Sequence, residues 1–351
     1  MTEEFEKIIA LADAATQRFP YNRIPWMWGE ALLMHALGLL NEELGEERYT
    51  AYIRGYVDHH IAKGCRIDQS DTLAPILAVY YLQKKFPGAG YEETTSRGID
   101  YIRNAKKILH NMPNHLGHSL EGRLYPKSIW VDSIMMYGVF TSLYAKEQKD
   151  AWLMDFAKSQ PAFFRSYLQD PEDKLFVHCY WTKSGRQYPE KLYWGRGNGW
   201  VIGAIPMLAD NLPSGTAKEE CINILNEVSR AVIPYQREDG YFETLLNRPG
   251  QTPKESSATA LISSGLMRGV RQGSLPPSFL DQGLKAFRSL IKDLDMHGGL
   301  LSMNHISGPT IALPLLPELG YKLQHKLQRT NDWSYGLAAH LFAGIEYEKI
   351  H

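Results

Sequence analysis

The sequence predicts an all-α fold, an (α/α)6 barrel of six helical hairpins in one domain that spans residues 1–351. Nearly every long segment carries apolar residues at helical spacing, and strand-like alternation is scarce. The helical segments number about twelve, and short connectors between them alternate with long, aromatic-rich ones. Six hairpins closed in a ring fit this pattern, and loops gathered at one end would form a pocket. No repeat of fixed period is present, so a TPR or HEAT array is less favoured, although a divergent solenoid remains open.

The expected helices, in chain order, end where proline or glycine interrupts the apolar spacing, as at Phe19-Pro20, Pro87-Gly88, Pro213-Ser214 and the segment from Gly273 to Pro277. They cover 2–18, 25–43, 46–63, 71–86, 92–111, 128–147, 150–168, 198–211, 216–236, 255–272, 277–294 and 332–347. The long connectors are 112–127, 169–197, 237–254 and 295–331. Their aromatic content allows two minor hairpins, around 174–181 and 240–246.

Composition excludes several classes of function. The formal net charge is -1, whereas a nucleic-acid-binding domain usually carries a basic excess, so we expect no nucleic-acid partner. No window approaches eighteen consecutive apolar residues, which excludes a membrane span by the length criterion. The acidic N-terminus lacks a basic segment followed by an apolar run, so no secretory signal is visible and a cytoplasmic protein is expected.

The cysteines and the common motifs give no sign of a metal or a cofactor. Cys65, Cys179 and Cys221 are odd in number and widely spaced, which fits reduced thiols better than a disulfide framework or a zinc set. No HExxH, paired CxxC, P-loop, GxSxG or EF-hand pattern occurs. We therefore expect neither a metal ion nor a cofactor.

The segment from Trp194 to Trp200, with sequence WGRGNGW, has the composition of a binding surface. Glycines permit close backbone approach or positive φ, an indole offers a flat face to a sugar ring, and Arg196 can grip a carboxylate with two hydrogen bonds. An acidic sugar is the ligand that this combination favours. The alternative is a helix-entry loop held by two core tryptophans.

Two acidic segments are candidates for proton chemistry. Asp132 lies among apolar residues after Ser128, a plausible N-cap, and an apolar surrounding raises the pKa of a carboxyl group toward neutrality. Asp68 and Asp71 precede another predicted helix, with Pro75 at an early position. Two carboxyl groups at one barrel mouth would make an acid/base pair. The alternative for each is helix capping. His178 and His118 are single histidines, for which a packed, hydrogen-bonded side chain is the default interpretation.

Taken in order along most of the chain, these segments resemble the unsaturated rhamnogalacturonyl hydrolases of glycoside hydrolase family 105, with the family 88 unsaturated glucuronyl hydrolases as near neighbours. The ordered set is far more specific than any one member. It consists of Trp130-Val131-Asp132, His178, the segment from Trp194 to Trp200, Glu255-Ser256-Ser257 and Asn331-Asp332. The resemblance implies the same barrel and the release of a 4,5-unsaturated uronic acid from the non-reducing end of lyase-generated oligosaccharides, with rhamnogalacturonan as the first expected source.

The resemblance also implies residue roles. Asp132 resembles the acid/base that hydrates the C4=C5 double bond, and Asp68 resembles the acidic residue that orients the uronyl ring. The residues expected to bind substrate are Trp130, His178, Trp194, Arg196, Asn198, Trp200 and Glu121. Glu121 is a departure, because the family often has histidine there, and a carboxylate would repel a uronate unless it were protonated or turned away.

Three alternatives remain open from the sequence, and the first is an unsaturated glucuronyl hydrolase that acts on another polysaccharide. The second is a non-catalytic sugar-binding or regulatory barrel, in which the acids serve only as caps. The third is a different (α/α)6 enzyme, such as a sugar epimerase, although those enzymes generally use histidine pairs and His178 and His118 are not an evident pair.

Overall fold

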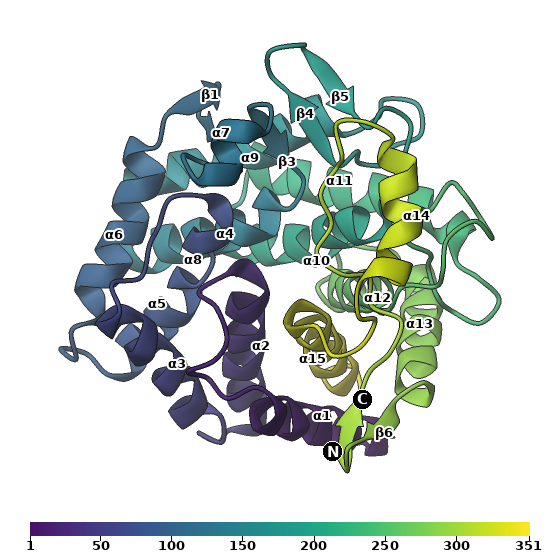
Figure 1. The fold of residues 1–351 in the computed structure, drawn as a ribbon, viewed down its shortest axis with the longest axis horizontal. Coiled ribbons are helices and arrows are strands. Elements are labelled where there is room, and N and C mark those ends of the chain that lie inside the picture. Colours follow the sequence, from purple (N-terminus) through teal and green to yellow (C-terminus); the bar gives the residue numbers. More distant parts are fainter.

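Helical hairpins arranged in a closed ring make up most of the protein. The computed structural model describes residues 1–351, and Figure 1 shows the ring. Around it, the inner helices are α2 (Trp28–Leu44), α5 (Ile76–Lys85), α8 (Val139–Gln148), α10 (Gly195–Asn211), α12 (Ser256–Arg271) and α15 (Ser334–Glu348). Their outer partners, in the same order, are α3 (Thr50–Ala62), α6 (Tyr91–Asn104), α9 (Ala151–Leu168), α11 (Thr216–Val232), α13 (Leu280–Lys292) and α1 (Glu3–Arg18). This arrangement is the (α/α)6 barrel, so the predicted fold class is confirmed.

The ring closes where the two chain ends meet, close together in Figure 1. Thr2 caps α1 by accepting a hydrogen bond from the amide of Phe5. The Thr2 hydroxyl in turn donates to Glu348 at the end of α15, at 2.7 Å. The first helix therefore serves as the outer partner of the last, which makes the sixth hairpin.

Burial distinguishes the inner from the outer helices. Every residue from 195 to 209 of α10 is buried, as expected for a helix surrounded by neighbours. In contrast, the outer helix α13 buries one stripe, which consists of Gly283, Ala286, Phe287, Leu290 and Ile291. The core is a cluster of 90 buried hydrophobic residues to which helices from both ends of the chain contribute. No helix is both long and apolar enough to cross a bilayer.

Short elements occupy the connectors. The short helices are α4 (Ser70–Leu73), α7 (Leu120–Leu124), the π-helix η1 (Ile134–Gly138), the 3₁₀ helices η2 (Ile233–Tyr235) and η3 (Pro277–Phe279), and α14 (Pro317–Leu327). Antiparallel strands pair as β1 (Lys107–Leu109) with β2 (Met112–Pro113), β3 (Ser128–Trp130) with β4 (Cys179–Trp181), β4 with β5 (Arg186–Tyr188), and β6 (Asp295–His297) with β7 (Leu300–Ser302). The three cysteines are buried and free, as expected.

The structure corrects several predicted boundaries. The helix expected at 92–111 ends at Asn104, because residues 107–109 pair with 112–113. The one expected at 71–86 is divided into α4 and α5 around Pro75, which has no amide to donate. A hairpin at 240–246 is absent, and only isolated bridges occur there. Of the expected strand 174–181, only residues 179–181 form β4.

Candidate active site

A short strand and a widened helical turn hold Asp132. The sequence predicts a helix from 128, but Ser128 to Trp130 form β3, which pairs with β4, and Asp132 lies in the following turn. The amides of Met135 and Met136 both donate to the Asp132 carbonyl, and the π-helix η1 begins two residues after it. Ser128 is therefore not a helix N-cap, and the prediction of a helix starting there was wrong. Widened turns of this kind occur frequently at functional sites.

Strand pairing brings His178 beside Asp132. The amide of Val131 donates to the carbonyl of His178 at 2.9 Å, one residue before β4 begins. Nε2 of His178 lies 3.6 Å from Oδ2 of Asp132. The imidazole is completely buried. It stacks on the ring of Trp194, with 4.4 Å between ring centres, and makes an edge-to-face contact with Trp130, with 4.9 Å between ring centres. Burial lowers the pKa of His178 well below its ordinary value, and the positive charge of Arg196 adds to this, so the ring is neutral.

The pKa of Asp132 is raised to about 6. Burial is the largest cause, and the negative charge of Asp71 acts in the same direction, while His115 and Arg196 oppose it. A carboxyl group with this pKa can give up a proton near neutral pH and take one back. The raised pKa expected from the apolar surroundings of Asp132 is therefore present in the structure.

Sequence reasoning missed His115 as a member of this cluster. Its ring stacks on Trp130, with 4.7 Å between ring centres and 8° between planes. Nδ1 lies 2.8 Å from the Ser133 hydroxyl, and Nε2 lies 3.5 Å from Oδ1 of Asp71. Its backbone connects both acidic segments, because its amide donates to Ser128 and its carbonyl accepts from Ser70. No spacing rule indicates this, since the connection depends on tertiary structure.

Asp68 and Asp71 have different surroundings. Asp68 is buried, receives a hydrogen bond from Thr72 at 3.1 Å, and lies 2.9 Å from Nε of Arg66. Asp71 is one of the main charges that shift the pKa of Asp132. Both raise the pKa of Tyr101, after burial as the main cause, and the Tyr101 hydroxyl is buried without a partner. The role of Asp68 stays a prediction, and Asp71 joins it as a second candidate carboxylate.

The segment from Trp194 to Trp200 forms the entry into α10 rather than an open loop. Its glycines allow close packing: a Cβ added to Gly195 would lie 2.4 Å from the carbonyl oxygen of Glu243, and one added to Gly199 would lie 3.0 Å from Cβ of Leu261. Positive φ angles occur at other glycines, not at these. The interpretation that these glycines serve the approach of a ligand was wrong, because they accommodate neighbouring protein atoms.

Arg196 is buried and holds a distant segment in place. Its guanidinium lies between the rings of Trp194 and Tyr335, at 4.6 and 4.7 Å from their centres. Nη1 donates to the carbonyl and hydroxyl of Ser307, and Nη2 donates to the carbonyl of Gly308 and the hydroxyl of Thr310. The expected two-pronged grip on a uronate is corrected accordingly, since both terminal nitrogens already have protein acceptors. Only Nε has no partner.

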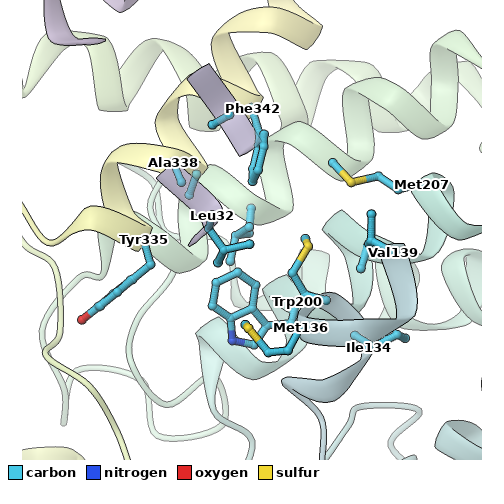
Figure 2. Packing of buried hydrophobic residues seen from close by; sticks show 14 of the residues in the cluster. Leu32, Ile134, Met136, Val139, Trp200, Met207, Tyr335, Ala338 and Phe342 are labelled. Carbon is cyan, nitrogen blue, oxygen red and sulfur yellow. The ribbon is translucent and has the colours of Figure 1, made fainter. Parts of the chain in front are cut away.

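Three further residues expected to bind substrate have surroundings of their own. Trp200 is completely buried and packs near Leu32 and Met136 in the core (Figure 2). Asn198 bonds to the amide and carbonyl of Phe176, so its role is structural. Glu121 is exposed on α7, where its own amide, Ser119 and Arg66 lower its pKa. The expectations for Asn198 and Glu121 are corrected, and for Glu121 the reason is that its carboxylate stabilises the start of α7. The expectation for Trp200 stays a prediction, because its Nε1 is buried without a hydrogen-bond partner.

The cluster is recognisable by its unpartnered polar atoms. Buried side-chain atoms without a hydrogen-bond partner include Oδ2 of Asp132, Nε2 of His178, Nε1 of Trp194, Nε of Arg196 and Nε1 of Trp200. Most buried polar atoms in proteins are paired, so several unpaired ones in a contiguous group indicate a ligand site. An acid with a pKa of about 6 beside N–H donors is suited to protonate an anionic substrate.

The segment from residue 303 to 331 lies over this cluster. Tyr321 on α14 reaches His178, and the backbone carbonyls of Ala312 and Leu313 accept hydrogen bonds from Tyr125 and Tyr188. Two surface cavities, of about 410 and 330 Å³, flank α14, and neither is lined by Asp132 or His178. No group of three or more His, Cys, Asp or Glu side chains is placed to hold a metal ion.

Comparison with known sequences yields relatives of one kind. An unsaturated rhamnogalacturonyl hydrolase, YesR of Bacillus subtilis, is 24% identical over 97% of this chain and 95% of its own length. An unsaturated 3S-rhamnoglycuronyl hydrolase of an Alteromonas species is 31% identical over 45% of this chain and 39% of its own length.

Solved structures of the same kind share the fold. A possible member of family GH105 from Salmonella enterica superposes with a TM-score of 0.87 at 20% identity, covering 99% of this chain and 94% of that one. The unsaturated glucuronyl hydrolase of Bacillus sp. GL1 gives 0.77 at 15% identity, covering 98% and 97%. The sequence model of glycosyl hydrolase family 88 matches residues 4–351. The resemblance inferred from the motifs is thereby confirmed: this chain is a glycoside hydrolase and belongs to glycosyl hydrolase family 88.

Proposed function

We propose that this enzyme removes a 4,5-unsaturated uronic acid from the non-reducing end of lyase-generated oligosaccharides, with rhamnogalacturonan fragments as its first substrates. The observation that carries the proposal is the buried carboxyl group of Asp132, whose pKa is raised to about 6 and whose unpartnered Oδ2 lies 3.6 Å from Nε2 of His178. The name of the relative that matches along nearly its whole length supports the choice of rhamnogalacturonan.

The reaction is a hydration followed by collapse. Protonated Asp132 donates its proton to C4 of the vinyl ether, and positive charge develops at C5 and the ring oxygen. The resulting carboxylate takes a proton from a water molecule, whose oxygen bonds to C5. The hemiketal opens to a ketone at C5, and the hemiacetal at C1 then expels the rest of the sugar as an alcohol. One water molecule is consumed, and Asp132 ends protonated, as it began.

Other members of the cluster serve binding and electrostatics. Nε2 of neutral His178 and the indole N–H of Trp194 are buried without a hydrogen-bond partner, and in this proposal they bind the uronate carboxylate. Trp130 provides an aromatic wall, held by a hydrogen bond from its indole to Ser128. Asp68 orients the uronyl ring by binding the hydroxyl groups of that ring. Asp71 keeps the pKa of Asp132 high. Arg196 adds a fixed positive charge while its terminal nitrogens hold the segment 307–310.

The test is loss of the ultraviolet absorbance of the conjugated double bond. Unsaturated oligosaccharides from rhamnogalacturonan, ulvan and glycosaminoglycan lyases would be supplied separately to the wild type and to Asp132→Asn. We expect activity on the rhamnogalacturonan product and a loss of at least about a thousandfold in kcat for the variant. Calorimetry should show that the variant still binds the substrate.

Two outcomes would contradict the proposal. A wild type that binds all three substrates without consuming the double bond would indicate a sugar-binding barrel. An Asp132→Asn variant with undiminished kcat would remove Asp132 from the chemistry. A preference for the ulvan product would keep the reaction and change only the source of the substrate.

We further propose that the protein acts as one domain in the cytoplasm, in pectin breakdown. Three buried, unpaired thiols support a reducing compartment. We expect one cooperative unfolding transition, as for a single domain, and recovery of the protein in the cytoplasmic fraction of disrupted cells. Several transitions, or recovery outside the cell, would contradict these expectations.

A further inference from the structure

Tyr321 enters the candidate active site from outside the ring of hairpins. It lies on α14, which is neither an inner nor an outer helix and which Figure 1 shows in yellow-green, in front of α10 and α12. The side chain is 1% exposed although most residues of α14 are not buried. Its hydroxyl lies 2.6 Å from Nδ1 of His178, a residue 143 positions earlier in the chain. The helix thus places one buried phenol against the imidazole beside Asp132.

This contact determines which imidazole nitrogen carries the proton. The Tyr321 hydroxyl has one hydrogen-bond partner, Nδ1 of His178. If Nδ1 carried the proton and donated it, the buried O–H of Tyr321 would have no acceptor, which is costly. If Tyr321 donates, Nδ1 accepts, and in a neutral imidazole the proton must then reside on Nε2. Burial raises the pKa of Tyr321 well above its ordinary value, so the phenol keeps its proton to donate.

The tautomer matters because Nε2 faces Asp132. With a proton on Nε2, His178 is a donor toward Oδ2 of Asp132, 3.6 Å away, and toward an anionic ligand between them. With a lone pair on Nε2, the ring would accept the proton of Asp132 in a hydrogen bond, or repel its carboxylate once that proton had gone. The first tautomer leaves the Asp132 proton for the substrate, and the second competes with the substrate for it.

We propose that Tyr321 is a positioning residue that fixes His178 as its Nε2–H tautomer and so directs one N–H toward Asp132 and the uronate. The statement about the tautomer depends on the structure alone, whereas the catalytic consequence rests on the proposed function. Tyr321 touches neither Asp132 nor the reacting atoms in this scheme. It acts through His178, and it does so only when α14 lies over the site.

The matched control is Tyr188, whose hydroxyl also binds the segment from residue 303 to 331. Tyr188 donates to the carbonyl of Leu313 at 2.6 Å and makes no hydrogen bond to His178. The variants Tyr321→Phe and Tyr188→Phe each remove one phenol hydroxyl that joins the segment from residue 303 to 331 to the rest of the protein. If Tyr321 served only to hold the segment down, the two variants would behave alike. If it sets the tautomer, only Tyr321→Phe will alter the imidazole.

Nitrogen-15 spectra of histidine-labelled protein, with His178 assigned by its loss in His178→Gln, report the tautomer directly. We expect a protonated Nε2 and an unprotonated Nδ1 in the wild type and in Tyr188→Phe, and a mixed or reversed pattern in Tyr321→Phe. We also expect kcat to fall at least about tenfold in Tyr321→Phe, with KM changing less than about threefold. Tyr188→Phe should keep a kcat close to that of the wild type.

A wild-type spectrum with the proton on Nδ1 would overturn the inference. This test uses the wild type alone, so it does not depend on whether a variant folds. An unchanged His178 pattern in a folded Tyr321→Phe would also overturn it, as would equal losses of kcat in the two tyrosine variants. A wild type with the expected tautomer but no activity on any unsaturated oligosaccharide would contradict the proposed function and leave the assignment of the tautomer standing.

Discussion

Oδ2 of Asp132 and Nε2 of His178 lie 3.6 Å apart, both are buried, and neither has a hydrogen-bond partner within the protein. The separation is too long for a hydrogen bond and suits two groups that share a third. One is a carboxyl group with a pKa of about 6, and the other belongs to a ring that stays neutral. Because the two groups differ in this way, a proton held by Asp132 can pass to a substrate without charging the histidine.

The dependence of activity on pH follows from the raised pKa of Asp132. The proton donor must be protonated when the substrate binds, and this form is depleted as pH rises above about 6. We expect kcat/KM on an unsaturated oligosaccharide to fall about tenfold per pH unit at high pH, with an apparent pKa near 6. Initial rates between pH 4.5 and 8.5 provide the check. A rate that increases through pH 6 would show that the carboxylate form starts the reaction.

The roles of Asp71 and Asp68 can be distinguished by the dependence of kcat/KM on pH. Asp71 raises the pKa of Asp132 by like-charge repulsion, so Asp71→Asn should move the alkaline fall in kcat/KM to lower pH. Asp68 is not among the main causes of the shift in the pKa of Asp132, so Asp68→Asn should leave the position of the fall nearly unchanged and raise KM. Full pH profiles of both variants are needed. The reverse pattern would restore Asp68 as the electrostatic partner.

Asp132 should make the fold less stable at neutral pH. Its pKa is about 6 in the folded state against 3.8 for an ordinary aspartate, so the folded state binds more protons between these values. The free energy of unfolding therefore decreases as pH rises from 3.8 to 6. We expect Asp132→Asn, which cannot ionise, to stabilise the protein at pH 7 by up to about 3 kcal/mol and to have little effect near pH 4. Urea unfolding at both pH values measures this.

Asp170 provides a control of opposite sign for that measurement. Burial raises its pKa, but the amides of Asp173 and Glu172 and the ammonium group of Lys191 outweigh burial, and the pKa is lowered. Asp170→Asn should therefore destabilise the protein at pH 7, with an effect that disappears as pH falls below the ordinary range of aspartate. Destabilisation by both variants at pH 7 would contradict the raised pKa of Asp132.

Arg196 should matter for folding as much as for activity. It lies 3.7 Å from Glu255, both side chains are fully buried, and it binds three residues of the segment 307–310. Arg196→Met leaves Glu255 without its cation and should lower the free energy of unfolding by about 3 kcal/mol or more. The exposed pair of Arg54 and Asp58 is the control, and Arg54→Met should cost less than about 0.5 kcal/mol. Equal costs would show that burial of the Arg196 pair has no consequence.

The sequence was sufficient for most of the inner helices and for the raised pKa of Asp132, for a physical reason. A helix enclosed by neighbours must be apolar on all sides, as α10 is, and this pattern is local. A carboxyl group among apolar residues has a raised pKa wherever the chain folds around it, so the interpretation of Asp132 did not depend on its exact backbone. The helix predicted from 128 failed because pairing of β3 with β4 joins residues about fifty positions apart.

The remaining errors in the site have the same origin. The acceptors that occupy Arg196 lie 111 to 114 residues away, and no local pattern identifies them. His115 and Tyr321 enter the cluster through equally distant contacts. For α14 there was a local signal: Pro317 at its start, followed by leucines at 319, 323 and 327, has the spacing of a helix.

Two glycines of α10 test whether close packing explains the glycine that follows Trp194. A Cβ at Gly195 would lie 2.4 Å from the carbonyl oxygen of Glu243, a backbone atom that cannot rotate away. At Gly203 the nearest atom would be 3.5 Å away, an ordinary contact.

Alanine is the better helix former, so Gly203→Ala should leave stability unchanged or raise it by up to about 1 kcal/mol. Gly195→Ala should lower the free energy of unfolding by about 2 kcal/mol and also reduce kcat, because Trp194 and Arg196 flank it. Urea unfolding and initial rates on the two variants decide the matter: if Gly195→Ala were as stable and active as Gly203→Ala, the close approach to Glu243 would not explain the glycine.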